Sequence, residues 1–177
     1  RQVVYTNGLT ITDDILNIIE DSKTNIVFSI DGTNKSSYEK IRKGGNFNKL
    51  LENLEKVKEI KNNESVQLST YLNPVIMRSN YKELMGFVEL AKAYKFDAVT
   101  FNPIRGEYEE NIFNPKDAKA FGYMKDILPE VEKKAQQEGV KLLNWLPIDY
   151  GDDSSDKEEC NKKIGVNKQK KNHSKIS

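Results

Sequence analysis

The sequence contains one cysteine, Cys160, and one histidine, His173, in 177 residues. A single thiol excludes a disulfide within the chain, and these two residues are too few to form a His/Cys metal cluster. We therefore expect no metal site built from this chain alone. Cys160 is expected to be a lone exposed thiol, because no further cysteine follows it.

Charge imbalance and long apolar runs are also missing. Lys plus Arg number 28 and Asp plus Glu number 27, so the formal net charge of +1 gives no global electrostatic reason to expect nucleic acid or a membrane surface as a partner. No apolar run approaches the roughly 20 residues that cross a bilayer, and residues 1–8 lack the regions of a signal peptide. We predict a cytoplasmic protein without nucleic-acid or membrane partners.

Strand-like and helical patterns alternate along most of the chain. Strands are expected at residues 3–7, 26–31, 66–73 and 98–102, with a weaker candidate at 140–146. Helices are expected between them, beginning at Thr12, at Ser36 with Glu39 in capping-box spacing, at Asn80 with Glu83, and at Asn114-Pro115. The alternation predicts right-handed βαβ units and a parallel sheet, either as a partial barrel or as an open doubly wound sheet.

Composition divides the chain into a folded domain, residues 1–148, and a polar tail, residues 149–177. The tail is first acidic and then basic and has almost nothing apolar, so we expect it to be disordered. A chain of 177 residues is short for a complete eight-unit barrel of about 250 residues. It also begins with Arg1 and enters a strand at once, which indicates a piece of a longer polypeptide.

Polar side chains gather on one face of the expected strands. Strand alternation places Ser29 with Asp31, and Thr100 with Asn102; the polar face of the strand between them carries Gln67, Ser69, Tyr71 and Asn73. Closed barrels fill their interior with branched apolar side chains, and a buried unpaired polar group costs about 1–3 kcal/mol. We infer that these strands line a lumen that binds a ligand.

The same residues converge on the carboxyl ends of the strands, where parallel α/β sheets bind their ligands. Asp31 offers an acceptor for sugar hydroxyls, Ser29 donates or accepts beside it, and Gly32 lets the backbone approach a ligand closely. This combination suits ribose. Asp31-Gly32 is also an ordinary turn dipeptide, and in an unrelated β/α-barrel lyase or isomerase Asp31 would be the candidate base.

Four segments resemble radical S-adenosylmethionine (radical SAM) enzymes of the SPASM-associated type in their order, their spacing and the residues that they contain. They are VVYTNG, IVFSIDGTNKSSYEKIRKGGNFNKLLENL, YLNPVIMRSNYKELMGFVELA and AVTFNPIRG, and they cover residues 3–106. The strongest element is SIDG followed by YEKIRKGG and a helix led by Phe47. The resemblance implies an α/β fold, a partial (β/α) barrel of the radical SAM type with parallel strands and outer helices.

The resemblance also implies S-adenosylmethionine (SAM) as cofactor and assigns site residues. Ser29 and Asp31 would hold the ribose of SAM. Further polar contacts would come from Asn73, from Asn102, and from Thr6 or Asn7. Arg42 is a candidate partner of the SAM carboxylate, although an exposed helical arginine in a surface ion pair explains it equally well.

The sequence departs from the family in lacking the CxxxCxxC loop that binds the 4Fe-4S cluster and the glycine-rich segment after the second strand; by resemblance both belong before residue 1. Without the cluster nothing delivers the electron that cleaves SAM to a 5'-deoxyadenosyl radical. The implied parent enzyme abstracts hydrogen from a peptide, protein or other substrate, whereas this chain alone is expected to be inactive. We assign no catalytic residue, and none in the acidic loop 107–110. An unrelated barrel lyase or isomerase, or a non-catalytic module that binds a partner through exposed apolar surface, remain alternatives.

Overall fold

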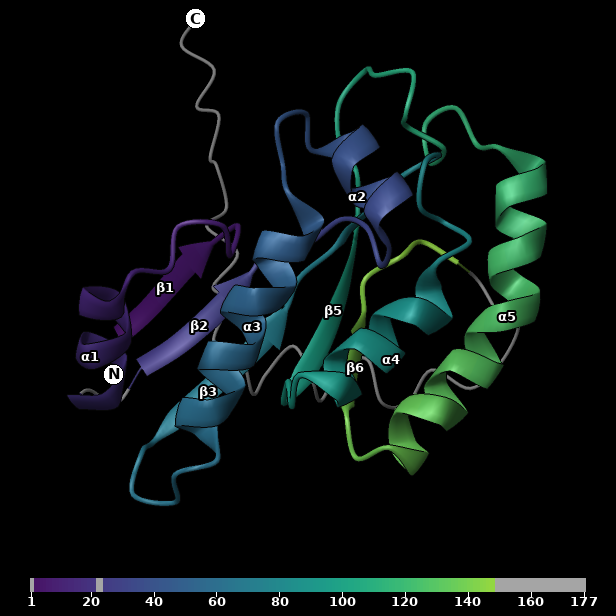
Figure 1. The fold of residues 1–177 in the computed structure, drawn as a ribbon. Coiled ribbons are helices and arrows are strands. Elements are labelled where there is room, and N and C mark those ends of the chain that lie inside the picture. The colour runs from purple at the N-terminus through teal and green to yellow at the C-terminus, as the bar shows by residue number, and fades with distance from the viewer. Residues whose placement is uncertain (1, 22–23, 149–177) are drawn as a thin grey trace, which may run out of the picture.

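Strands and helices alternate along the part of the chain that the computed structural model describes, residues 2–21 and 24–148 (Figure 1). In chain order the elements are β1 (Gln2–Thr6), α1 (Asp13–Asp21), β2 (Thr24–Phe28), α2 (Lys35–Ile41), α3 (Phe47–Lys61), β3 (Leu68–Leu72), β4 (Val75–Ile76), α4 (Leu84–Ala93), β5 (Ala98–Pro103), α5 (Ala118–Gln137) and β6 (Lys141–Asn144). The predicted tail, residues 149–177, lies outside the described residues.

The six strands form one sheet, and every strand pair in it is parallel. β1 pairs with β2, β2 with β3, β3 with β5, and β5 with β6. β4 also pairs with β5, in the register that β3 already has, because Leu72 is opposite Val99 and Val75 is opposite Asn102. β4 therefore continues β3 after an interruption at Pro74, which has no backbone N–H to donate. The parallel α/β sheet is confirmed, and β4 is a strand that the sequence analysis did not predict.

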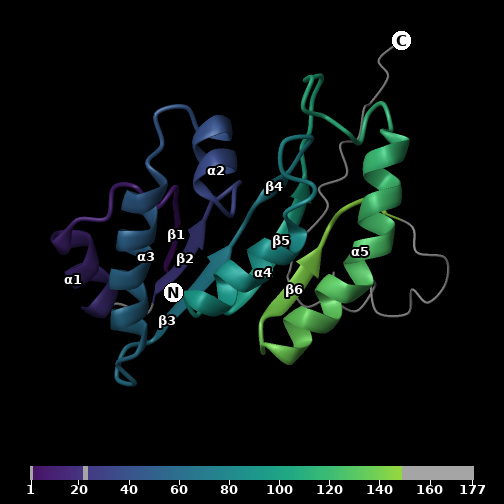
Figure 2. The same cartoon turned by 45° about the vertical axis from the view of Figure 1, so that its right-hand side comes forward.

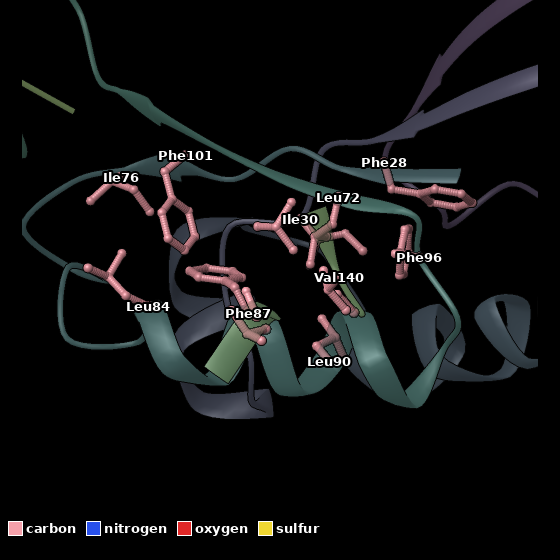
Figure 3. Packing of buried hydrophobic residues seen from close by; sticks show 14 of the residues in the cluster. Phe28, Ile30, Leu72, Ile76, Leu84, Phe87, Leu90, Phe96, Phe101 and Val140 are labelled. Atoms are coloured by element: carbon pink, nitrogen blue, oxygen red, sulfur yellow. The ribbon is translucent and has the colours of Figure 1, made fainter. Parts of the chain in front are cut away.

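The helices α1, α3, α4 and α5 lie along one face of the sheet, and α2 lies above its carboxyl end (Figures 1 and 2). β2 and β3 alternate between buried and half-buried residues, with their buried apolar residues in the main hydrophobic core. Phe28 packs edge-on against Phe96, with ring centroids 5.4 Å apart, and Phe101 against Phe87, at 6.2 Å (Figure 3). The half-buried residues occupy the opposite face.

Asparagine and aspartate side chains begin three of the helices. Asn34 accepts from Ser37 N at the start of α2, Asn46 from Lys49 N at α3, and Asp117 from the backbone at α5. The predicted capping box at Ser36 is therefore wrong: the Asn34 side chain already caps the helix two residues earlier. The predicted start of the last helix at Asn114-Pro115 is also too early, since α5 begins only at Ala118.

The start predicted at Thr12 is confirmed, because its hydroxyl accepts from Ile15 N (3.4 Å) just before α1. The start predicted at Asn80 is wrong. α4 begins at Leu84, and the Asn80 side chain accepts instead from Met77 N (2.8 Å).

In the described ranges, no helix is both long and apolar enough to cross a membrane.

Candidate cofactor-binding site

A row of polar side chains crosses the carboxyl end of the sheet, on the face away from the helices. Backbone bonds from Ser29 N to Thr6 O (2.9 Å) and from Asn73 N to Phe28 O (2.8 Å) extend the ladder past the strand ends. With the register of β3 and β5, this extension aligns a set of four residues that we call the polar belt: Asn7, Ser29, Asn73 and Thr100. The predicted convergence of polar residues on this rim is therefore present.

Next to the belt, Asn102 and Trp145 lie closer to the carboxyl ends of their strands. Asn102 Nδ2 donates to Asn73 Oδ1 at 2.6 Å, so two of the predicted site residues contact each other directly. Trp145 N donates to Phe101 O (3.0 Å), which places the single tryptophan of the chain beside Asn102. Its side chain is 45% exposed. The sequence analysis did not single out Trp145, because it lies in the weakest of the predicted strands, residues 140–146.

Ser29 is half-buried in the middle of the belt. Among the residues that the structure describes, no hydrogen bond involves its hydroxyl group. The pair formed by Asn73 and Asn102 leaves the Asn73 amide nitrogen as a donor and the Asn102 carbonyl oxygen as an acceptor. The centre of the belt thus presents a hydroxyl and amide groups to a ligand.

Asp31 is buried, with 3% exposure, and donors of this chain engage both of its carboxylate oxygens. Oδ2 accepts from Arg42 through Nε (2.8 Å) and Nη2 (2.6 Å), and Oδ1 accepts from Val75 N (2.8 Å). Arg42 Nη2 also lies 3.4 Å from the Ser29 carbonyl oxygen. Arg42 thus forms an ion pair with the buried carboxylate of Asp31 and not the surface ion pair that was expected as one alternative. This pair and the bond from Val75 N fasten the end of β2 to α2 and β4.

Gly32 lies directly under the backbone of α2. A Cβ atom at this position would lie 2.4 Å from Tyr38 N and 2.6 Å from Tyr38 Cα. The close approach that we expected a ligand to make is made by the helix instead, and that expectation is wrong. Glycine is required here because α2 packs against the chain as it leaves the sheet.

Tyr38 fills the space between this loop and α3. It is 0% exposed and its ring packs against Phe47, with centroids 5.5 Å apart. Burial raises the pKa of the Tyr38 hydroxyl above its usual value; the nearby Arg42 opposes this rise and Asp31 adds to it. Tyr38 therefore stays a neutral phenol at physiological pH and contributes packing.

Two residues that the sequence patterns indicated as helix caps hold the loop after β2. The Glu83 carboxylate oxygen Oε2 accepts from Thr33 N (2.7 Å), Thr33 Oγ1 (2.7 Å) and Ser37 Oγ (2.9 Å). Asn80 Nδ2 donates to the carbonyl oxygens of Asp31 and Val75, both at 2.9 Å. The partners in the loop are distant in sequence, so no local pattern could have revealed these bonds.

The two predicted residues of the first strand are placed differently. Thr6 is opposite the buried Phe28, hence on the helix-covered side, and its hydroxyl accepts from Gly8 N (3.0 Å). Asn7 lies in the polar belt, with its Oδ1 accepting from Leu9 N (3.0 Å). Of these two candidates, Asn7 is the one on the face of the sheet away from the helices.

No metal centre is formed within residues 2–21 and 24–148, where no three His, Cys, Asp or Glu side chains come close enough to hold an ion. Cys160 and His173 lie outside the described residues.

In the acidic loop, residues 107–110, Glu110 accepts from Ser79 N (2.8 Å) and Ser79 Oγ (2.9 Å) and so anchors the loop after β5.

An apolar groove lies between β1 and α1, at the edge of the sheet that β1 forms. The β1–α1 groove has a volume of about 350 Å³ and is lined mainly by apolar side chains, among them Val4, Ile11, Ile15 and Ile18. Ile19 is buried at 4% exposure, whereas Ile18 is 62% exposed.

No protein-family model matches the sequence, and no curated protein matches it. Solved structures do match. Native anSMEcpe with bound AdoMet has a TM-score of 0.59 at 16% identity over 81% of this chain, and Streptococcus suis SuiB has 0.61 at 13% over 80%. Both are radical SAM SPASM enzymes. The α/β fold of this chain, a parallel sheet flanked by helices, matches part of their partial barrel.

The radical SAM likeness stated from the sequence is thus matched in the fold, and the partial barrel is favoured over the doubly wound sheet. The chain spans only 39% of anSMEcpe and 32% of SuiB. Two further matches bear on ligands. SuiB bound to S-adenosylmethionine has a TM-score of 0.60 at 13% identity, covering 80% of this chain and 32% of SuiB. Native anSMEcpe with bound AdoMet and Cp18Cys peptide has 0.57 at 16%, covering 80% and 39%.

Proposed function

We propose that this chain is the part of a radical SAM enzyme that holds the sugar end of SAM, in a protein that acts on a peptide or protein substrate. The observation that carries the proposal is the polar belt at the carboxyl ends of parallel strands, with the Ser29 hydroxyl at its centre. Parallel α/β barrels bind their ligands at this end. The radical SAM fold and the SAM-bound relatives support the same ligand.

The residues present fit the polar part of SAM. A ribose diol needs one partner that both donates and accepts, which a serine hydroxyl provides, and amide groups beside it to fix its orientation. We assign Ser29 to a ribose hydroxyl and Asn73 and Asn102 to further polar atoms of SAM. SAM, once bound and reductively cleaved, supplies the radical that takes hydrogen from the substrate.

Asp31 and Arg42 have an indirect role in this proposal. Their mutual ion pair and the bond from Val75 N occupy the Asp31 carboxylate, so the pair holds the rim in place rather than contacting the ribose. Because these hydrogen bonds engage both oxygens of the Asp31 carboxylate, they disfavour the barrel lyase or isomerase, in which Asp31 would be the base. A base needs a free oxygen within reach of the proton that it removes.

The iron-sulfur cluster that reductive cleavage requires does not fit this chain. The sequence has one cysteine, and three thiolates hold the cluster in the family that the sequence resembles. We therefore derive no chemical step at a cluster here. The part played by this chain is to bind and orient SAM, and the peptide substrate is proposed from the peptide-bound relative.

Replacing Ser29 with alanine is expected to weaken SAM binding about five- to tenfold, because one hydrogen bond of about 1–1.4 kcal/mol is lost. Isothermal titration of the purified chain with SAM measures this change. Ser36→Ala is the matched control, since Ser36 is exposed on α2. Equal affinities of the Ser29 and Ser36 variants would contradict the assignment, and no SAM binding by the unaltered chain would contradict the proposed function.

The β1–α1 groove favours a second property, the binding of further polypeptide. β1 is exposed along most of its length and pairs with β2 only, within the described ranges. An open strand edge beside an apolar groove is suited to a strand with apolar side chains on one face. This is the interaction that the non-catalytic alternative requires, and it is compatible with SAM binding at the rim.

Ile18→Ser is expected to reduce concentration-dependent self-association of the chain, because it removes exposed apolar surface from the groove. Sedimentation velocity at several protein concentrations measures the association. Tyr108→Ser, which removes a 66% exposed side chain elsewhere, is expected to leave it unchanged. A chain that stays monomeric at every concentration would show that the groove does not drive self-association.

A further inference from the structure

The loop that follows β2 is fixed to α4 by one residue, Thr33. The Glu83 carboxylate accepts both the backbone N–H and the hydroxyl of Thr33, at 2.7 Å each, together with the Ser37 hydroxyl at 2.9 Å. Glu83 occupies the cap position of α4 but makes no side-chain cap bond to its own helix. Its carboxylate therefore serves the loop, 50 residues earlier in the chain.

Gly86, in the first turn of the same helix, forms the other half of this contact. A Cβ atom at Gly86 would lie 2.8 Å from Thr33 Oγ1 and 3.1 Å from Thr33 Cβ. Thr33 can reach Glu83 only because residue 86 has no side chain. Glu83 and Gly86 thus hold Thr33 in a fixed position, which we call the Thr33 seat. Glu83 accepts the hydrogen bonds of Thr33, and Gly86 leaves room for its side chain.

We propose that Glu83 is a positioning residue for SAM binding, which fixes loop 31–37 and thereby the rim that carries Ser29. This inference rests on the proposed function. Ser29 lies two residues before Asp31, and Arg42 at the end of α2 contacts both residues. Glu83 holds the beginning of α2 and Arg42 its end, so the helix is tied down on both sides of the rim.

The expected consequence is a gain in affinity through preorganisation. A rim that is already ordered loses less conformational freedom when a ligand binds, so the same contacts give a tighter complex. If the Thr33 seat is removed, the loop should fluctuate in the free chain and SAM should bind more weakly. The contacts between Ser29 and SAM would themselves remain.

Three variants of the full chain test this inference. Glu83→Ala is expected to weaken SAM binding about fivefold, with Glu83→Gln in between because its amide oxygen still accepts a hydrogen bond. Gly86→Ala is expected to weaken binding as well, although alanine favours the helix and would raise its stability. Glu89→Ala, at an exposed position of α4, is the control and should bind like the unaltered chain.

Isothermal titration with SAM gives the affinities, and hydrogen exchange followed by mass spectrometry gives the order of residues 31–37. Faster exchange of this loop together with weaker binding in the Glu83→Ala and Gly86→Ala variants supports the inference. Unchanged SAM affinity in both variants, when the unaltered chain binds SAM, overturns it. Absence of SAM binding by the unaltered chain instead overturns the proposed function.

Discussion

Gly32→Ala is expected to lower the free energy of unfolding by about 3 kcal/mol, the upper end of the range for overpacking. The added methyl group would meet the backbone of Tyr38 at 2.4 Å, and a backbone atom inside a helix cannot move aside as a flexible side chain can. Either α2 must shift away from the sheet or the chain leaving β2 must bend. Urea denaturation followed by circular dichroism measures the change.

Gly122→Ala provides the matched control for this substitution. Gly122 lies within α5, and apart from the nearby backbone of its own helix no atom of the described residues lies within 4 Å of the position of its missing Cβ. Alanine should therefore raise the free energy of unfolding, by about 0.8–1 kcal/mol, because it favours the helix over glycine. If both variants changed stability in the same direction, the packing of α2 on Gly32 would not be as described.

Asp31→Ala is expected to cost about 3 kcal/mol of stability, near the lower end for breaking a buried ion pair, since Arg42 is partly exposed. The substitution leaves the Arg42 guanidinium without its partner and the Val75 N–H without an acceptor. It should also loosen the connection between β2 and β4. Thermal and urea denaturation report the loss of stability.

Glu52→Ala removes a carboxylate from an exposed pair and serves as the comparison. Lys49 and Glu52 lie 3.3 Å apart with side chains 48% and 64% exposed, so their pairing should contribute less than about 0.5 kcal/mol. A loss of equal size in the Asp31 and Glu52 variants would mean that Asp31 does not fasten the rim.

The belt could be predicted from the sequence because it depends on local rules. Strand alternation fixes which side chains share a face, and parallel strands bring their carboxyl ends to one edge. Ser29, Asn73 and Thr100 could therefore be grouped without knowledge of any tertiary contact. The helix-facing position of Thr6 could not be predicted in this way, because the register between β1 and β2 decides it.

The residues that hold the rim were missed for a different reason. Asn80 and Glu83 have the types and spacing of a helix start, and this local reading hid their actual partners, Asp31 and Thr33, 49 and 50 residues away. The sequence also has no pattern that shows α2 packing on Gly32 or the ion pair between Asp31 and Arg42, because both depend on tertiary contacts.

The central claim, that SAM binds at the carboxyl end of the sheet, is tested most directly by following backbone amide chemical shifts while the chain is titrated with SAM. The account predicts that the largest shifts fall on residues 29–33, on 73, 75 and 76, and on 100–102, with the indole N–H of Trp145 also affected. Shifts confined to the opposite ends of the strands, around residues 24, 68 and 141, or no shifts at saturating SAM, would contradict it.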